Sequence, residues 1–272
     1  MIIKGKEFNT ENNVYIMGIL NVTPDSFSGG GSFNNTDKAL FHVEEMINQG
    51  ADIIDVGGES TRPQHIQITE EEEIERVYSV LSEIRKRFDI PLSLDSYKSN
   101  VIKANLCHID LINDIWGLKY DNEIAHIIAK SNLPCCIMHN RKNNSYTDFF
   151  NEFISDIKES LAIAQKAGIP KGNIILDGGV GFAKDYQQNL TVINRTDELC
   201  RLGYPVMIAT SRKSVIGLTL DKEVSDRLYG TVATTVTGVI KGASFVRVHD
   251  ISQNCDAIEM TKSILEERKW TK

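Results

Sequence analysis

The sequence lacks the features that mark membrane, secreted and nucleic-acid-binding proteins. Its 272 residues contain no apolar run of the roughly 18 residues that a membrane span needs, and the first residues lack the apolar region of a signal peptide. Lys and Arg number 30 against 37 Asp and Glu, for a net charge of -7. This balance argues against nucleic acid as a partner, because phosphate backbones are bound by basic surfaces. We expect a cytoplasmic protein with no membrane contact that acts on small molecules.

Cysteine is scarce and its spacing excludes common metal and disulfide frameworks. The five cysteines are odd in number, and no two of them form Cys-x-x-Cys. We therefore expect neither a zinc site nor a disulfide scaffold. Cys135 and Cys136 stand inside an apolar run, where buried core positions are the favoured interpretation.

Short apolar runs of strand length alternate with longer segments of helical period. These eight runs are Tyr15–Leu20, Ile53–Val56, Pro91–Leu94, Leu111–Ile112, Pro134–Met138, Ile174–Leu176, Pro205–Ala209 and Phe245–Val248. The intervening helices carry start and stop signals. Thr36 is a candidate N-cap, Thr69 with Glu72 predicts a capping box, and Gly168 ends a helix over 148–167. The last two helices are predicted over 227–241 and 252–268.

Apolar strands separated by helices indicate a parallel sheet that is covered on its faces. Eight strand–helix units in this length predict a (β/α)8 TIM barrel, with residues 1–272 forming a single domain. Residues 2–8 are expected to form a short hairpin that caps the barrel bottom. A doubly wound open sheet is the structural alternative, but no Gly-x-Gly-x-x-Gly follows the first strand, which disfavours its dinucleotide-binding form.

Polar residues follow or end every predicted strand, and in a barrel these positions meet at one rim. Taken singly, an Asp or Asn after a strand is most often a turn former or a helix cap. Eight such positions together predict a polar mouth, and therefore an active site. The polar residues at these eight strand ends include Asn21, Asp55, Asp95, Asn113, Asp114, His139, Asp177, Arg212, Lys213, Arg247 and His249.

The mouth divides into two chemical halves. Asp95, Asn113 and Asp177 suit a flat heterocycle with N–H donors, such as the guanidine-like edge of a pterin. The second half is cationic and suits phosphate groups; it comprises Arg212, Lys213, Arg247 and His249. Asn21 offers an oxygen ligand that Mg²⁺ accepts together with diphosphate oxygens and water. No covalent nucleophile is indicated, because Gly-x-Ser-x-Gly is absent.

Long motifs spread over nearly the whole chain resemble those of dihydropteroate synthases. The two most specific are Gly18-Ile-Leu-Asn-Val-Thr-Pro-Asp-Ser-Phe-Ser28 and Asp55-Val-Gly-Gly-Glu-Ser-Thr-Arg-Pro63. Shorter blocks follow in the family's order, at 93–96, 112–114, 179–182, 211–214 and 247–250. The resemblance implies that the chain joins a pterin methyl diphosphate to p-aminobenzoate and releases diphosphate by an SN1-like path, usually as a homodimer.

The resemblance also implies roles for individual residues. Asn21 is the expected Mg²⁺ ligand, and Asp25, Arg62 and Lys213 are the expected catalytic group. The implied pterin contacts are Asp95, Asn113, Asp177 and Lys213; the implied diphosphate contacts are Thr61, Arg247, Val248 and His249; the implied p-aminobenzoate contacts, where family members change when they resist sulfonamides, are Phe27, Pro63 and Ser214.

This chain departs from the family pattern at three places. Gly178 replaces the usual Pro of Asp-Pro-Gly, Ala209 replaces a usual Gly, and Asn140 stands where Met is common. We expect Gly178 to loosen the backbone beside Asp177. Two rival hypotheses are a methyltetrahydrofolate–corrinoid methyltransferase-like barrel, which should lack the loop from Asn21 to Phe27, and a pterin-binding protein without catalysis.

Overall fold

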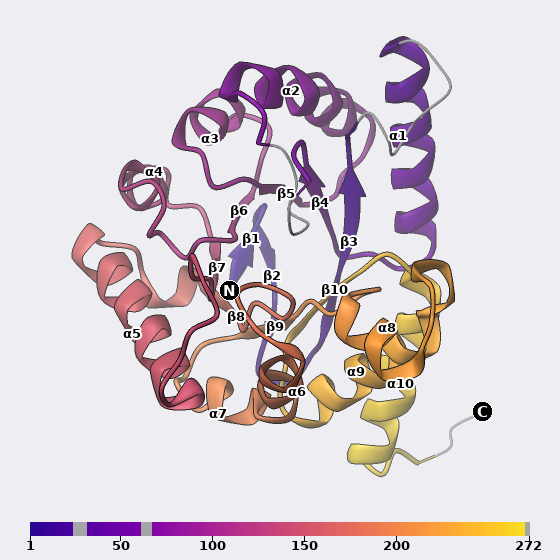
Figure 1. The fold of residues 1–272 in the computed structure, drawn as a ribbon. Coiled ribbons are helices and arrows are strands. Elements are labelled where there is room, and N and C mark those ends of the chain that lie inside the picture. The colour runs from indigo at the N-terminus through magenta and orange to yellow at the C-terminus, as the bar shows by residue number, and fades with distance from the viewer. Residues whose placement is uncertain (24–31, 61–66, 270–272) are drawn as a thin grey trace.

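The eight apolar runs are strands that close into a parallel barrel ringed by helices (Figure 1). The computed structural model describes residues 1–23, 32–60 and 67–269. Around the barrel the strands follow chain order, and the last strand, β10, pairs with the first, β3. The predicted TIM barrel is confirmed, and the open doubly wound sheet is excluded because each of the eight barrel strands has two neighbours.

The barrel strands are β3 (Tyr15–Asn21), β4 (Ile53–Gly57), β5 (Leu92–Asp95), β6 (Leu111–Asp114), β7 (Cys135–Met138), β8 (Ile174–Asp177), β9 (Val206–Ile208) and β10 (Phe245–Val248). The helices are α1 (Ser32–Asn48), α2 (Glu70–Arg87), α3 (Ser99–Asn105), α4 (Glu123–Ser131), α5 (Phe149–Ala167), α6 (Tyr186–Asn194), α7 (Thr196–Cys200), α8 (Ser214–Leu220), α9 (Leu228–Ile240) and α10 (Ile251–Leu265), with short 3-10 turns η2 (Lys171–Asn173) and η3 (Val224–Asp226).

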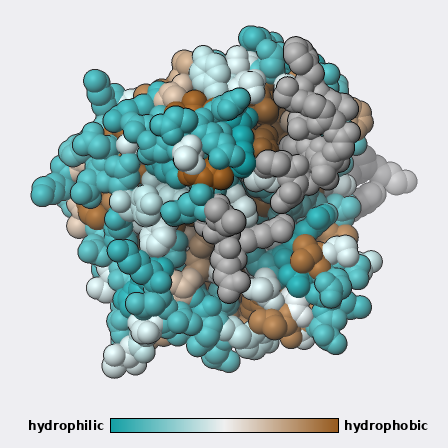
Figure 2. Space-filling model, turned by 45° about the horizontal axis from the view of Figure 1, so that its top comes forward, coloured by the Kyte–Doolittle hydropathy of each residue, from teal (hydrophilic) through white to brown (hydrophobic). Residues whose placement is uncertain are grey.

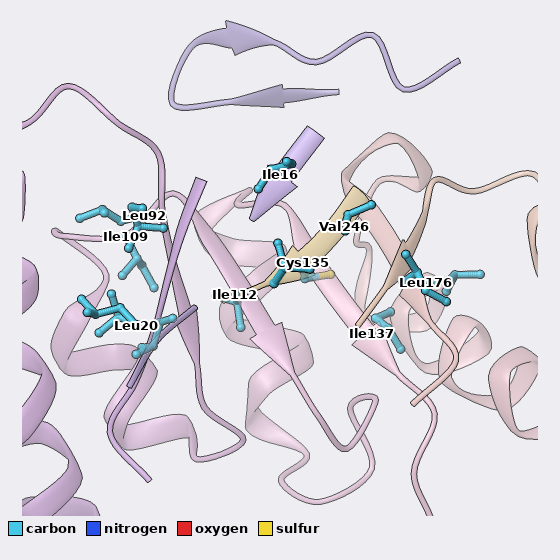
Figure 3. Packing of buried hydrophobic residues seen from close by; sticks show 14 of the residues in the cluster. Ile16, Leu20, Leu92, Ile109, Ile112, Cys135, Ile137, Leu176 and Val246 are labelled. Carbon is cyan, nitrogen blue, oxygen red and sulfur yellow. The ribbon is translucent and has the colours of Figure 1, made fainter. Parts of the chain in front are cut away.

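Successive side chains along each strand point alternately outward and inward, so the apolar side chains form two layers. Outward-facing side chains such as Ile16, Leu92 and Val246 pack against the helices in the main core cluster (Figure 3). Inward-facing side chains form a second cluster, here called the floor cluster. Its barrel members are Met17, Ile53, Leu111, Cys136, Ile175, Met207 and Phe245.

The N-terminal hairpin closes the barrel beneath the floor cluster, as predicted. Strands β1 (Ile2–Ile3) and β2 (Lys6–Glu7) pair antiparallel, and the hairpin lies across one end of the barrel (Figure 3). Ile3 and Phe8 are buried in the floor cluster. The Phe8 ring lies 4.6 Å from the Tyr15 ring and 6.3 Å from the Phe245 ring. Aromatic packing therefore holds the hairpin against this end of the barrel.

Helix α10 ends at Leu265, three residues before its predicted end at 268, and the starts of two other helices also differ from the predictions. Helix α1 begins at Ser32, one turn before the predicted cap Thr36, which therefore lies inside the helix. Only half of the predicted capping box forms at α2. Thr69 Oγ1 accepts from the Glu72 backbone N–H at 3.2 Å, whereas the Glu72 carboxylate pairs with Arg76 at 2.5 Å.

The surface is largely hydrophilic on the face shown in Figure 2, where hydrophobic side chains appear as separate patches. Within the described part of the chain, no helix is both long and apolar enough to span a bilayer. Large exposed apolar side chains gather instead on α8, α9 and α10, which lie together in Figure 1.

Candidate functional site

A layer of buried polar side chains lies directly above the floor cluster. Four floor residues are each followed two positions later, on the same inward face, by a polar residue. These pairs are Ile53 with Asp55, Leu111 with Asn113, Ile175 with Asp177, and Phe245 with Arg247. Asp95 joins them from the end of β5, where it is level with Asn113. Strand alternation therefore brings the predicted pterin half together.

Arg247 is the centre of this layer. Its Nε lies 2.6 Å from Asp55 Oδ2, and its Nη2 lies 2.7 Å from Asp95 Oδ2. Asn113 Nδ2 donates to the same Asp55 oxygen at 3.1 Å. From the sequence, Arg247 was expected in the phosphate half, and Asp55 was expected at the rim without a place in either half. The structure places Arg247 between two carboxylates of the pterin half, and Asp55 at the bottom of the site. A charged residue inside the apolar run 53–56 is the signal that could have identified Asp55.

Two carboxylate oxygens of this layer have no partner among the described residues. They are Asp55 Oδ1 and Asp95 Oδ1, and both are buried. Burial raises the pKa of Asp95 to about 7, although the Arg247 guanidinium opposes the rise. A buried acceptor without a donor is unfavourable. These two oxygens are therefore available to a ligand that presents N–H groups.

Asp177 and Lys213 form the opposite wall. Asp177 Oδ1 accepts from the Gly179 backbone N–H at 2.8 Å, and burial raises the pKa of Asp177 although Lys213 opposes this. Lys213 Nζ donates to the Val180 carbonyl at 2.5 Å and lies 4.9 Å from the centre of the Phe182 ring. Burial lowers the pKa of Lys213 to about 8. Phe182, which sequence reasoning did not single out, adds an aromatic face beside this lysine.

Hydrogen-bond donors that follow β9 and β10 lie at the rim of the barrel. His249 Nδ1 lies 2.9 Å from Ser211 Oγ, which also accepts from the His249 backbone N–H. Arg212 is held by Asp250 through contacts of 2.5 and 3.1 Å. Ser214 begins α8. Val248, predicted to contact substrate, has its side chain in the main core cluster, so only its backbone is left to face the mouth.

Asn21 ends β3 beside Gly57 and Asp95. A Cβ built on Gly57 would stand 3.7 Å from Asn21 Oδ1 and 3.7 Å from Asp95 Oδ2, so both oxygens flank this glycine. Among the described residues, no group of three or more His, Cys, Asp or Glu side chains could hold a metal ion. A single amide oxygen nevertheless fits Mg²⁺, which commonly keeps waters and binds substrate phosphates.

Five predicted site residues lie outside the described residues: Asp25, Phe27, Thr61, Arg62 and Pro63. The chain on either side of residues 61–66 is anchored by Lys98, which sequence reasoning missed. Lys98 Nζ contacts Glu59 Oε2 at 2.5 Å, Glu73 Oε2 at 2.8 Å and the Ile68 carbonyl at 2.8 Å. Lys98 follows the strand-end pair Asp95-Ser96 by two residues, but no sequence pattern indicates its long-range partners.

Gly178 is in close contact with α6. A Cβ at this position would lie 2.5 Å from Val192 Cγ1 and 3.7 Å from the Phe153 ring. Its φ is not in the left-handed region, so the missing side chain reflects crowding and not a backbone requirement for glycine. The expected loosening beside Asp177 is therefore accompanied by close packing against Val192.

Comparisons with known proteins agree with this geometry. The family model described as pterin binding enzyme matches residues 17–249. A dihydropteroate synthase of Clostridium beijerinckii is 52% identical, over 97% of this chain and 99% of the relative. A structure of the Clostridium difficile dihydropteroate synthase, solved in the presence of pteroic acid, has a TM-score of 0.93 at 47% identity and covers 95% of this chain and 99% of that one.

A second similar structure is the Xanthomonas albilineans dihydropteroate synthase with 4-aminobenzoic acid. It has a TM-score of 0.89 at 34% identity and covers 93% of this chain and 94% of that one. The family model spans most of the chain, and the relatives match it from end to end. The chain belongs to the dihydropteroate synthase family of pterin-binding transferases.

Proposed function

We propose that this protein condenses a dihydropterin methyl diphosphate with p-aminobenzoate to give dihydropteroate and diphosphate. The observation that carries the proposal is the pair of unpartnered carboxylate oxygens of Asp55 and Asp95, buried opposite Asp177 and Lys213. Similar proteins have been solved with pteroic acid and with 4-aminobenzoic acid, which correspond to the product side and to the second substrate.

The pterin is proposed to lie flat above the floor cluster. Its N–H groups would donate to Asp95 and Asp177, and Asn113 and Lys213 would complete the hydrogen bonding. Paired donors on a carboxylate give orientation as well as affinity. The site is largely shielded from water, so these interactions are stronger than at the surface.

The reaction breaks the bond between the pterin methylene carbon and the diphosphate oxygen, and the electron pair leaves with the diphosphate. The amine nitrogen of p-aminobenzoate then bonds to the methylene carbon and loses a proton. An SN1-like order fits the electrostatics, because nearby carboxylates favour a cationic methylene and basic groups favour the leaving anion. We assign the leaving anion to Thr61, His249, the Val248 backbone and Arg247, with Asp25, Arg62 and Lys213 as the catalytic group. Because Nε and Nη2 of Arg247 already pair with Asp55 and Asp95, only its remaining N–H groups would reach the anion.

The p-aminobenzoate side is assigned to Phe27, Pro63 and Ser214. Ser214 begins α8 directly after Lys213, whose stem packs over Gly181 with Cδ 3.2 Å from the Cβ position of that glycine. An aromatic amine positioned here would reach the same methylene carbon that the diphosphate leaves.

Mg²⁺ is the proposed cofactor, held by Asn21. When bound, the ion would neutralise charge on the diphosphate. The role of Asn21 can be tested without turnover. Mg²⁺ should strengthen binding of inorganic diphosphate to the wild-type protein, measured by calorimetry, and Asn21→Ala should remove that dependence. An unchanged dependence would contradict the assignment.

The chain is further proposed to act in the cytoplasm as one domain and as a homodimer. The five cysteines are free, as in a reducing compartment. The exposed apolar side chains of α8, α9 and α10 are the proposed dimer surface. These include Leu218, Tyr229, Ile240, Met260 and Ile264.

The deciding experiment measures diphosphate release from purified protein with the pterin methyl diphosphate and Mg²⁺, with and without p-aminobenzoate. Release that requires p-aminobenzoate and yields dihydropteroate is the expected result. Tight pterin binding without release would instead support the non-catalytic hypothesis. Transfer of a methyl group from a folate to a corrinoid would support the methyltransferase hypothesis.

A further inference from the structure

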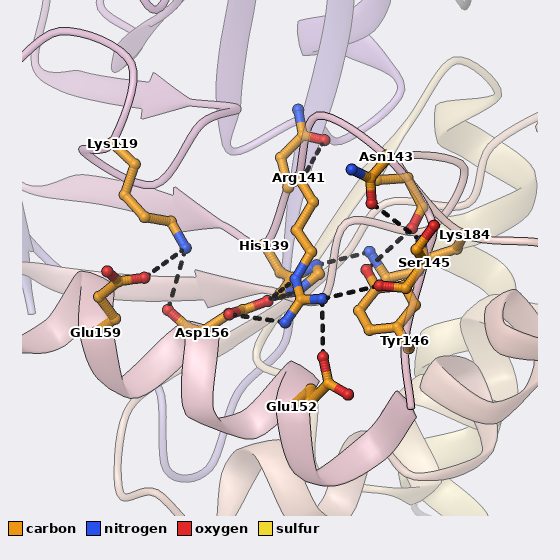
Figure 4. Close-up of polar contacts among 12 residues, drawn as sticks. Lys119, His139, Arg141, Asn143, Ser145, Tyr146, Glu152, Asp156, Glu159 and Lys184 are labelled. Atoms are coloured by element: carbon orange, nitrogen blue, oxygen red, sulfur yellow. Dashed lines mark hydrogen bonds and ion pairs between the residues drawn. The ribbon is translucent and has the colours of Figure 1, made fainter. Parts of the chain in front are cut away.

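A second polar cluster lies behind the wall formed by Asp177 and Lys213. It joins His139, which follows β7, Arg141 and Tyr146 of the next loop, Asp156 of α5, and Lys184, which follows β8 (Figure 4). We call it the Asp156 cluster. None of its members is assigned to substrate, yet His139 is fully buried and the cluster borders the turn that follows Asp177.

Lys184 has an acceptor for each of its three N–H donors. Its Nζ lies 2.8 Å from His139 Nδ1, 2.9 Å from the Gly179 carbonyl and 3.0 Å from the Phe182 carbonyl. Burial lowers the pKa of Lys184 to about 7, and the Asp177 carboxylate opposes that shift. Three acceptors around one nitrogen favour the ammonium, which alone has three donors.

His139 connects Lys184 to Asp156. Because Nδ1 accepts from Lys184, the ring proton belongs on Nε2, which lies 3.0 Å from Asp156 Oδ2. Burial lowers the pKa of His139 to about 4, so the ring is neutral and keeps this tautomer. Arg141 fixes the carboxylate through both oxygens of Asp156, at 2.5 and 3.1 Å. The imidazole therefore has one orientation.

The two carbonyls that Lys184 holds belong to the turn that builds the pterin wall. Gly179 has a φ of +64°, and a Cβ there would stand 2.0 Å from the His139 carbonyl oxygen. The Gly179 N–H donates to Asp177, and the next carbonyl, that of Val180, accepts from Lys213. Tyr146 adds a further bond to this segment, from its hydroxyl to the Ala183 carbonyl at 3.0 Å.

We propose that Lys184 is a positioning residue for pterin binding: oriented by His139 and Asp156, it clamps the turn over 178–182 and thereby places Asp177 and Lys213. This inference rests on the proposed assignment of Asp177 and Lys213 to the pterin. Gly178 increases the need for such a clamp, because glycine restrains the chain less than the family's usual proline.

The test compares Lys184→Met with the matched control Lys119→Met. Lys119 also reaches α5, through Asp156 O and Glu159, but it does not touch the turn. Binding of a hydroxymethyl pterin without diphosphate is measured by calorimetry, and the KM for p-aminobenzoate is measured by turnover. Backbone amide exchange is followed by mass spectrometry in peptides covering 178–184.

Lys184→Met should weaken pterin binding about tenfold or more, as expected for loss of charged hydrogen bonds. Amide exchange over 178–184 should accelerate, and the KM for p-aminobenzoate should change much less. Lys119→Met should match the wild type in all three measurements. Pterin affinity within twofold of wild type, or equal losses of pterin and p-aminobenzoate, would overturn the proposal.

Tyr146→Phe provides a milder variant should Lys184→Met fold poorly. It removes one hydroxyl bond to the same segment and should accelerate exchange over 178–184 with a smaller loss of pterin affinity. Unchanged exchange in both variants would refute the clamp. If the wild-type protein itself bound no pterin, the proposed function would fail, while the exchange comparison would still decide whether Lys184 holds the turn.

Discussion

Arg247 and Asp55 are 192 positions apart in the chain, yet Arg247 Nε lies 2.6 Å from Asp55 Oδ2 at the centre of the barrel. Asp55 is fully buried, and the side chain of Arg247 is only 15% exposed. Removing one member of such a pair leaves an uncompensated buried charge, which destabilises more than the pair itself stabilises.

Arg247→Met should therefore reduce the free energy of unfolding by about 3–5 kcal/mol, and addition of Asp55→Asn should restore part of that loss. Urea denaturation of both single variants and the double variant measures the coupling. The exposed pair of Lys86 and Glu83 on α2 serves as the control, and its substitution should have little effect. Strictly additive losses at Arg247 and Asp55 would show that the two side chains are not coupled.

Asp177→Asn should weaken pterin binding by about 100-fold, because an amide replaces a buried acceptor of N–H groups with a mixed donor and acceptor. Calorimetry with a pterin that lacks the diphosphate isolates this contact from the phosphate contacts. Asp89→Asn, at the opposite end of the barrel, is expected to bind normally. Near-normal pterin affinity of Asp177→Asn would remove Asp177 from the proposed site.

Gly178→Ala should destabilise the fold, since the new Cβ would lie 2.5 Å from Val192 Cγ1. Overpacking of this kind costs about 1–3 kcal/mol. Gly172→Ala is the matched control, because no atom lies within 4 Å of its Cβ position. Adding Val192→Ala should reduce the penalty of Gly178→Ala. Equal stabilities of the Gly178 and Gly172 variants in urea would disprove the crowding argument.

Acid should destabilise the protein in part through His139 and Asp156. The folded pKa of His139 is lowered to about 4 from its usual 6.5, first by burial. Between pH 4 and 6.5 the unfolded chain thus binds a proton that the folded chain does not, and the free energy of unfolding falls by up to about 1.4 kcal/mol per pH unit as pH decreases. Burial alone would raise the pKa of Asp156, but bonds from His139 and Arg141 hold it well below its usual range, so stability continues to fall below pH 4.

Denaturation curves at several pH values measure this slope, and His139→Gln should flatten it by one proton between pH 4 and 6.5. Proton NMR of the folded wild-type protein provides an independent check. The His139 ring resonances should not titrate above about pH 5. Titration near pH 6.5 would contradict the buried, neutral imidazole.

Tyr229→Glu should convert the proposed dimer to a monomer. Tyr229 is 84% exposed on α9, and a buried unpaired carboxylate at an apolar interface is strongly unfavourable. Light scattering after size exclusion measures the mass. Tyr78→Glu, an exposed tyrosine on α2, should leave the mass unchanged. A monomeric wild-type protein would reject the dimer altogether.

The amino-acid sequence alone predicted the architecture of the protein. Eight apolar runs alternating with helices predicted a covered parallel sheet, and eight such units in a chain of this length favoured the closed barrel over the open sheet. Residues 2–8 predicted the closing hairpin. Asp95, Asn113 and Asp177, which end three of the strands, predicted one wall of the site, because the carboxyl ends of parallel strands lie at the same rim of the barrel.

Only the tertiary structure decided which polar side chains of the site contact one another. Arg247 carries a charge suited to phosphate, yet strand alternation directs it inward between Asp55 and Asp95, and the same alternation turns the Val248 side chain outward. Lys98 and Lys184 look like ordinary surface lysines in sequence. Their roles arise from contacts with residues 25 to 45 positions away. The local sequence carries no signal for such pairs, because the closure of the strands and loops around the barrel determines which residues meet.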